Sequence, residues 1–221
     1  MERPFQTRFE DLPKILPIFP LPGVLLLPEG RLPLNIFEPR YLAMVQDALG
    51  WGRMIGMIQP NGPEPKPGAD PALYETGCAG RISSFSETDD GRILLTLTGV
   101  SRFSIRSELE NVQGYRRVIA DWTPFRADLD EPEEPEIDRA RLLGLLKVHL
   151  KLKNIDLNWN ALETAGNLAL TVSLPMALPF EPSEKQAMLE AATPALRAET
   201  LLTLLEMSVA EATGGLTTLK Q

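Results

Sequence analysis

The sequence predicts an α+β protein in which a β-rich N-terminal region precedes a C-terminal α-helical bundle. Apolar and polar residues alternate with the period of a strand up to about residue 122, and apolar residues recur at helical spacing after about residue 137. An acidic, proline-rich stretch at 128–136 (DLDEPEEPE) separates the two patterns. We therefore expect a β-barrel-like region over 1–127, a solvated acidic linker over 128–136 and a helical bundle over 137–221.

The N-terminal region contains a series of segments with strand character. The clearest is Ile93–Thr98, in which apolar residues alternate with polar ones, and the pattern resumes at Phe103 and Ile105 after a bend near Gly99. Gly77 and Gly80 lie within another strand pattern and indicate bulges or tight bends of a curved sheet. The expected strands cover 15–19, 24–27, 32–37, 53–59, 74–87, 93–98 and 115–122.

One helix interrupts these strands. Apolar residues at helical spacing predict it from about residue 39 to 49, and Gly50 suits the left-handed position just past a helix. The sequence Asp89-Asp90-Gly91 favours a hairpin turn, and residues 60–71 (PNGPEPKPGADP) are typical of an exposed, proline-rich loop.

The C-terminal region has the spacing and the caps of helices. Ser183 begins a capping box with Gln186, and Thr193 is suited to cap a helix that has Pro194 at its first position. Pro175 and Pro179 predict an extended link. The expected helices cover 135–153, 159–173, 183–191 and 194–212.

Composition limits the functions to consider. Of 221 residues 43% are hydrophobic, which is enough for a buried core, and the formal net charge of −8 disfavours binding to nucleic acid. A single cysteine, Cys78, allows no intrachain disulfide, and no apolar run is long enough for a signal peptide or a membrane span. These features predict a cytoplasmic protein that binds neither nucleic acid nor membrane.

Motifs for catalysis are missing from the sequence. It contains neither a GxxxxGK[ST] phosphate loop nor a GxSxG nucleophile elbow. The only histidine, His149, lies in an amphipathic helical pattern and is expected at the surface or partly packed, and Cys78 is expected to be a small buried residue. The acidic run lacks the central glycine of a calcium loop. We therefore expect no catalytic residue, no cofactor and no metal.

Two proline-bracketed apolar segments, 20–28 and 174–180, remain open to two interpretations. Exposed apolar patches usually mark protein contacts, but half-buried strands and packed links have the same sequence pattern. The sequence alone does not separate these alternatives.

An ordered series of motifs resembles a known family. It consists of LPIFPLPGVLLLP, LPLNIFEPRYLAMVQDAL, MIGMI, ETGCAGRI and DDGRILLTLTGVSRF, within residues 15–122. In this order the motifs resemble the N-terminal domain of ATP-dependent Lon protease (protease La, peptidase family S16). The form IFEPRY resembles small stand-alone bacterial proteins built of this domain only.

The resemblance implies a β-rich, PUA-like pseudo-barrel followed by a helical bundle. It also implies recognition of protein substrates and support of oligomer assembly, so homo-oligomers are one expectation. In the protease, ATP hydrolysis and proteolysis reside in later domains. The resemblance therefore implies a chain that is not an enzyme.

Our leading hypothesis from the sequence is a non-catalytic polypeptide-binding module, an adaptor or modulator of proteolysis whose partners are unfolded or apolar segments and a protease. Such segments would bind in a groove between barrel and helices, or add a strand to an open sheet edge. The candidate contact residues are Leu32, Phe37, Glu38, Arg40 and Tyr41. Glu38 and Arg40 have an alternative role as a structural cap and ion pair. A small-molecule hydrolase and an RNA-binding PUA-like protein are the alternative functions.

Overall fold

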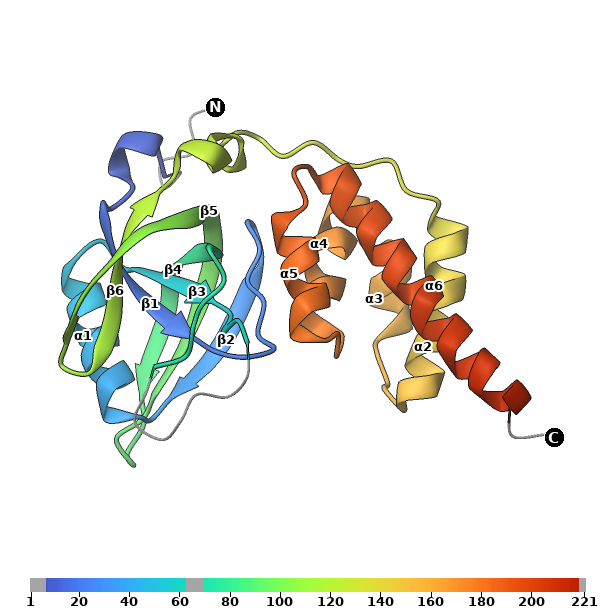
Figure 1. The fold of residues 1–221 in the computed structure, drawn as a ribbon, viewed down its shortest axis with the longest axis horizontal. Coiled ribbons are helices and arrows are strands. Elements are labelled where there is room, and N and C mark those ends of the chain that lie inside the picture. The colour runs from blue at the N-terminus through green and yellow to red at the C-terminus, as the bar shows by residue number, and fades with distance from the viewer. Residues whose placement is uncertain (1–6, 63–69, 219–221) are drawn as a thin grey trace. The chain divides into compact units, whose positions relative to one another are not determined.

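The computed structural model describes residues 7–62 and 70–218, and side chains as far as residue 212. A six-stranded sheet is followed by helices, so the predicted α+β class is confirmed (Figure 1). The chain divides into two compact units. The first comprises Met1–Glu131 and Pro179–Leu189, and the second comprises Pro132–Leu178 and Glu190–Gln221.

The first unit is a closed barrel. Its strands follow the order β2-β5-β4-β3-β1-β6, and the long strand β5 also pairs with β6 beyond Ser104, which closes the ring. β1 and β3 are parallel, and the other pairs are antiparallel. The strands are β1 (Ile15–Pro20), β2 (Arg31–Ile36), β3 (Met54–Ile58), β4 (Thr76–Glu87), β5 (Ile93–Val112) and β6 (Tyr115–Asp121).

Three strand segments extend beyond the ring and form what we call the arm: β2, residues 82–87 of β4 and residues 93–98 of β5. The first half of β5 lies between β2 and β4, with Thr96 opposite both Pro33 and Ser84. β3 pairs with β4 only as far as Arg81. The turn at Asp89-Asp90-Gly91 joins β4 and β5 as the sequence predicts.

The barrel core is built around Phe103, which is fully buried with Leu16, Ile18 and Val118. A Cβ on Gly77 would lie 2.6 Å from the Phe103 ring, so only glycine allows this strand to pass the ring. The register of β4 against β5 shifts at Ala79/Gly80, which confirms the bulge expected there.

The helix α1 (Pro39–Gly50) confirms the predicted helix, but its end differs from the prediction. Gly50 is still helical, and the left-handed positions follow at Gly52 (φ 79°) and Arg53 (φ 60°). The chain reverses there because Arg53 donates its N–H to the carbonyl of Ala48.

The predicted strand at 24–27 is wrong. The segment is irregular, yet Leu25, Leu26 and Leu27 are fully buried. Hydrogen bonds from Gly30 to the Leu27 carbonyl and from Glu29 to the Gly99 carbonyl hold the following turn on the sheet. Residues 25–27 are therefore part of the buried core. The sequence had left open whether this segment is core or an exposed surface for protein contacts.

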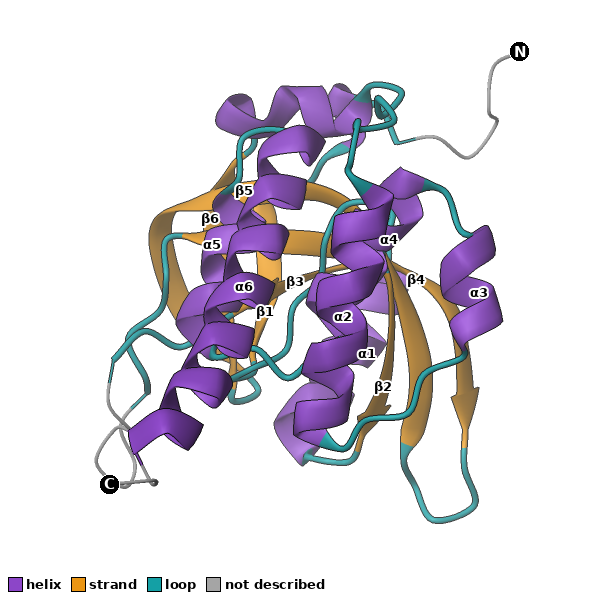
Figure 2. Ribbon diagram, turned by 90° about the vertical axis from the view of Figure 1, so that its right-hand side faces the viewer, coloured by secondary structure: helices purple, strands orange, loops and turns teal. Residues whose placement is uncertain are grey.

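The second unit contains the helices α2 (Arg139–Lys153), α3 (Trp159–Thr164), α4 (Asn167–Ala177) and α6 (Pro194–Thr218). α2 and α6 lie side by side (Figure 2), joined by an Arg141–Glu206 ion pair and by a 2.9 Å contact between His149 Nδ1 and Ser208 Oγ. His149 is buried, so the expected surface or partly packed position is wrong.

Where one helix was expected at 159–173, the structure has two. Arg139 donates to the carbonyls of Leu162, Glu163 and Ala165, which stabilises the break between α3 and α4. α4 continues through Pro175 to Ala177 instead of becoming extended, since a proline in the last turn removes only one backbone hydrogen bond. Leu174 and Pro175 are buried in this turn.

The remaining helix, α5 (Pro182–Glu190), was expected within the C-terminal bundle, but Pro179–Leu189 belongs to the barrel unit. Lys185 Nζ donates to the Gly23 carbonyl (2.8 Å), Gln59 Nε2 to the Pro182 carbonyl (2.9 Å) and Gln186 Nε2 to the Thr76 carbonyl (3.1 Å). Glu184 accepts the N–H of Glu181 in place of the predicted Ser183 cap, whereas the Thr193 cap of α6 is confirmed.

Candidate functional site

The structure separates the five predicted contact residues into two groups. Leu32 is half-buried on β2, and Phe37 follows the end of β2 with 61% of its surface exposed. The guanidinium of Arg92 lies 5.9 Å from the centre of the Phe37 ring. These two apolar residues belong to the arm or directly follow it.

The other three residues begin α1. Glu38 and Arg40 form an exposed ion pair (2.9 Å), and Glu38 makes no side-chain cap. The Arg40 guanidinium lies 4.5 Å from the centre of the Tyr41 ring, and the centre of the Phe19 ring lies 4.1 Å from the same point. Tyr41 is only 6% exposed. The three residues therefore form a packed stack with a charged outer end.

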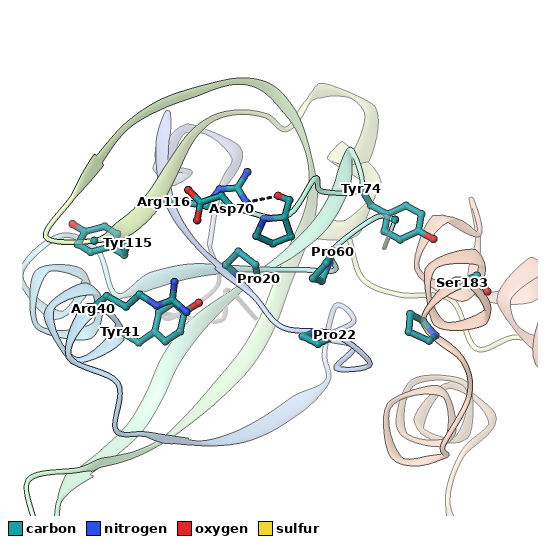
Figure 3. Close-up of a pocket in the computed structure, with 14 residues that line it drawn as sticks. Pro20, Pro22, Arg40, Tyr41, Pro60, Asp70, Tyr74, Tyr115, Arg116 and Ser183 are labelled. Atoms are coloured by element: carbon teal, nitrogen blue, oxygen red, sulfur yellow. Dashed lines mark hydrogen bonds between the residues drawn. The ribbon is translucent and has the colours of Figure 1, made fainter. Parts of the chain in front are cut away.

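Arg40 and Tyr41 line a pocket of ≈ 590 Å³ in the first unit (Figure 3). Its walls come from β1, the start of α1, the segments flanking β3 and β4, the β5–β6 turn and the start of α5. Aromatic and proline side chains dominate it. The lining prolines and tyrosines are Pro20, Pro22, Pro60, Pro71, Pro182, Tyr41, Tyr74 and Tyr115, and the polar lining residues are Arg40, Arg116, Asp70 and Ser183.

Most polar groups of this pocket have partners. Arg116 donates to both carboxylate oxygens of Glu108 and to the Pro71 carbonyl. The Tyr115 hydroxyl donates to Asp47 at 2.7 Å. Burial, together with that hydrogen bond, raises the pKa of Tyr115 to about 12. The hydroxyl of Tyr41 differs, since it has no hydrogen-bond partner in the described part of the chain, and burial raises its pKa.

The arm carries the second candidate surface. A hollow of ≈ 470 Å³ is lined by residues 33–35, 84–86 and 94–96. Phe85 and Leu94 are large apolar side chains of the arm that are 47% and 46% exposed, on opposite faces of the sheet, because Phe85 lies opposite Leu95 and Leu94 opposite Ser86. Neither was among the predicted site residues, although both lie in a segment that the sequence predicts as strand.

A family model described as the ATP-dependent protease La (LON) substrate-binding domain matches residues 15–207. The chain belongs to this family. Because the match covers both structural units, all the features above are parts of a Lon substrate-binding domain.

Curated relatives agree with this assignment. The chain is 28% identical to Lon protease 2 of Myxococcus xanthus over 89% of its own length and 24% of that protein. It is 27% identical to the Lon protease of Anaeromyxobacter dehalogenans over 93% of its own length and 24% of that protein. The chain thus spans about a quarter of the curated relatives that it matches.

Solved structures show the same fold. A Lon N-terminal domain protein from Xanthomonas campestris superposes with a TM-score of 0.58 at 24% identity, covering 86% of this chain and 97% of that one. The N-terminal domain of a Mycobacterium avium complex Lon protease gives a TM-score of 0.57 at 15% identity, covering 87% and 98%.

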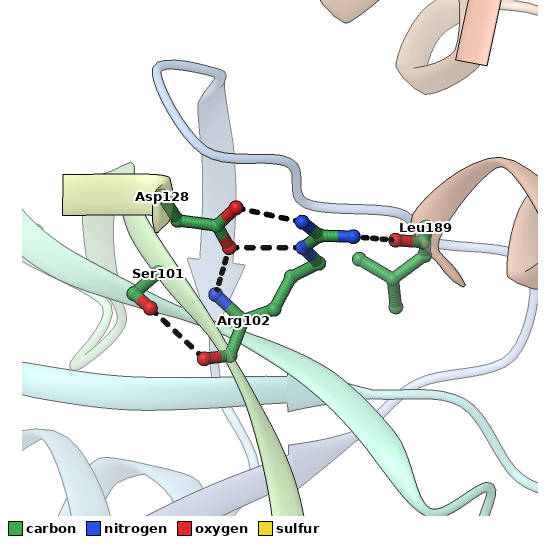
Figure 4. Close-up of polar contacts among 4 residues, drawn as sticks. All are labelled: Ser101, Arg102, Asp128 and Leu189. Carbon is green, nitrogen blue, oxygen red and sulfur yellow. Dashed lines mark hydrogen bonds and ion pairs between the residues drawn. The ribbon is translucent and has the colours of Figure 1, made fainter. Parts of the chain in front are cut away.

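A buried ion pair stabilises the barrel of this Lon domain beside α5 (Figure 4). Arg102 contacts both carboxylate oxygens of Asp128 and donates Nη1 to the Leu189 carbonyl. Asp128 lies in the acidic run that was expected to be a solvated linker, and for this residue the expectation is wrong. The carboxylate is buried because it neutralises a buried guanidinium.

Within residues 7–62 and 70–218, no group of three His, Cys, Asp or Glu side chains is placed to hold a metal ion. Cys78 is buried, as expected. No helix in that part of the chain is long and apolar enough to cross a membrane.

Most of the pocket residues were not predicted from the sequence. Tyr74 and Tyr115 lie far from α1 in the chain and approach it only in the folded domain. The feature that they share with Tyr41 in the sequence is residue type, because the chain has only three tyrosines and all three line this pocket.

Proposed function

We propose that this Lon substrate-binding domain binds extended apolar polypeptide segments on the arm and acts as an adaptor or modulator of proteolysis. The observation that supports this most directly is the edge of β4. Residues 84–87 pair with β5 on one side, Ser83 lies at a register shift, and no described residue pairs with the other side of 83–87. An unpaired strand edge is a template for an added strand.

The arm's other edge, β2, suits strand addition less well. Pro33 has no N–H, so its nitrogen is placed on the edge away from β5, where a proline is tolerated. A strand added there would lose one ladder hydrogen bond. The β4 edge contains three serines, a phenylalanine and a glutamate, and no proline interrupts it.

Exposed aromatic side chains flank the β4 edge. Phe85 is part of this edge. The edge begins at Ile82, whose N–H donates to the carbonyl of Arg53. Trp51, which is 87% exposed, precedes Arg53 by two residues. Backbone hydrogen bonds would supply affinity for any extended segment, and the two aromatic rings would favour apolar side chains.

On this proposal the domain does no chemistry of its own. Support comes from the sequence, which has no phosphate loop, and from the family match, which is to a substrate-binding domain. A bound segment would be presented to a protease.

The test measures binding of a fluorescent, permanently unfolded protein, reduced and carboxymethylated lactalbumin, by anisotropy. Phe85→Ala should weaken binding roughly 10-fold, the size of an interface hot spot. The matched control is Leu196→Ala, because Leu196 is an apolar residue of the second unit with the same exposed fraction of 47%.

Equal losses for both variants, or no binding by the unaltered chain, would contradict the proposal. Arg40→Ala tests the original prediction for α1. On the present proposal it weakens binding of the unfolded protein less than Phe85→Ala does, because Arg40 lines the pocket and is not part of the arm.

A further inference from the structure

We infer that the tyrosine-lined pocket is a second binding site, which takes a proline-containing peptide segment in the polyproline II conformation with a basic residue beside the prolines. This inference does not depend on the proposed role of the arm. It rests on three properties of the pocket: the chemistry of its walls, one unpaired hydrogen-bond donor, and an excess of negative charge.

The walls are rigid and apolar. Of the residues that the structure describes, three tyrosines and five prolines line the pocket, and proline side chains lose no rotamer freedom when a ligand binds. Grooves lined by aromatic residues are a recurrent way to bind polyproline II segments, whose conformation is largely formed before binding. A volume of ≈ 590 Å³ is within the range of small-ligand pockets and suits a few residues of such a segment.

The donor is the hydroxyl of Tyr41. The residue is only 6% exposed, between Phe19 and Arg40, and the hydroxyl has no partner among the residues that the structure describes. A polyproline II segment makes no internal hydrogen bonds, so its carbonyl groups need donors. Since prolines have no N–H, such a segment needs few hydrogen-bond acceptors from the pocket. The Tyr41 hydroxyl and the neighbouring Arg40 guanidinium can supply such donors.

The charge around the pocket determines the flanking residue. Two guanidinium groups, of Arg40 and Arg116, line it. Against them stand the lining carboxylate of Asp70 and three carboxylates bonded to lining residues, those of Glu38, Glu108 and Asp47. Among the described residues, these four negative charges against two positive ones favour a lysine or arginine in the ligand and disfavour an acidic segment.

The experiment uses three fluorescein-labelled peptides of equal length and the full chain. The first repeats the unit Pro-Pro-Lys, the second has alanine in place of every proline, and the third has glutamate in place of every lysine. We expect micromolar binding of the first, and affinities at least roughly 10-fold lower for the other two. Equal binding of all three, or no binding of the first, would overturn the inference.

Variants then place the site. Tyr41→Phe keeps the ring and removes only the hydroxyl, so the affinity should fall about 5-fold, the effect of one hydrogen bond. Asp70→Asn should reduce the preference for the lysine peptide over the glutamate peptide about 3-fold without affecting the fold. Phe85→Ala is the control and should leave peptide binding unchanged.

The two proposals fail separately. Loss of unfolded-protein binding in Phe85→Ala with intact peptide binding supports both sites. If Tyr41→Phe and Asp70→Asn both bind the peptide like the unaltered chain, the pocket is not its site and the inference is wrong, whatever the arm does.

Discussion

Arg102 and Asp128 form a buried, two-pronged ion pair, with Nη2 2.7 Å from Oδ1 and Nε 2.9 Å from Oδ2. Their side chains are only 5% and 9% exposed. Because the backbone N–H of Arg102 also donates to Asp128, and Nη1 to the Leu189 carbonyl, the pair joins a barrel strand, the segment after β6 and α5.

Removing the carboxylate should therefore destabilise the fold. Asp128→Ala leaves a buried guanidinium without its counter-charge, and we expect a loss of about 3–5 kcal/mol in the free energy of unfolding, measured by urea denaturation. Glu206→Ala removes a partner from the half-exposed Arg141–Glu206 pair and should cost no more than about 1 kcal/mol. Similar losses would show that Arg102 finds water or another partner.

Gly99 should tolerate no side chain. A Cβ there would lie 1.9 Å from the backbone carbonyl oxygen of Leu27, and backbone hydrogen bonds with Glu29 and Gly30 fix this approach. We expect Gly99→Ala to destabilise the domain by roughly 3 kcal/mol or more in the same assay, through strain and loss of the turn at 27–30.

Gly144 provides the opposite case. It lies within α2, and a methyl group added to its Cα would meet no described atom within 4 Å outside its own helix backbone. Because glycine is a poor helix former, Gly144→Ala should raise the free energy of unfolding by about 0.5–1 kcal/mol. A destabilising effect would mean that the methyl group meets an obstruction there.

Tyr115 should make stability depend on alkaline pH. Burial and the hydrogen bond to Asp47 raise its pKa from 10.0 to about 12. As the pH rises from 10 to 12, the unfolded chain releases this proton and the folded chain retains it, so the contribution of Tyr115 to stability is lost through that range. Ultraviolet titration of the phenols should show one group near pH 12 that is missing in Tyr115→Phe. Asp47→Asn should lower that pKa.

Lys185 should show the reverse relation to pH. Burial lowers its pKa from 10.5, and its Nζ donates to one carbonyl, that of Gly23. Below the folded pKa the charged group disfavours folding, and the native chain recovers stability as the pH rises towards 10.5. The free energy of unfolding of Lys185→Met and of the unaltered chain should therefore be measured at about pH 7 and about pH 10. We expect the variant to be more favoured, relative to the unaltered chain, at the lower pH. A difference that does not change with pH would contradict this.

The sequence predicted the elements that depend on neighbouring residues. Alternation located most of the strands, the Asp-Asp-Gly turn located a hairpin, and Thr193 with Pro194 located the start of α6. These signals depend on a few consecutive residues, and the structure retains them.

Long-range contacts explain the errors. Val24–Leu27 has the composition of a strand, but no described residue pairs with it in the sheet. Its leucines are buried in an irregular segment instead. Lys185 and Gln186 are typical of a helix surface, yet both are buried, and carbonyls of Gly23 and Thr76, far away in the chain, accept their hydrogen bonds. The pocket tyrosines meet for the same reason, because barrel closure brings distant segments together.

The return of the chain at Pro179–Leu189 has a mechanical consequence. The backbone crosses between the two units at 131/132, at 178/179 and again at 189/190, so both ends of α5 are tethered to the second unit. Tension applied at either end of α5 would therefore load the Lys185–Gly23 and Arg102–Leu189 hydrogen bonds, whereas tension at 131/132 would load the segment that follows β6. A cut at 131/132 would leave two polypeptides joined only by non-covalent contacts, among them the hydrogen bonds of α5 to the barrel, and a fragment ending at residue 131 would lack that helix of its own unit.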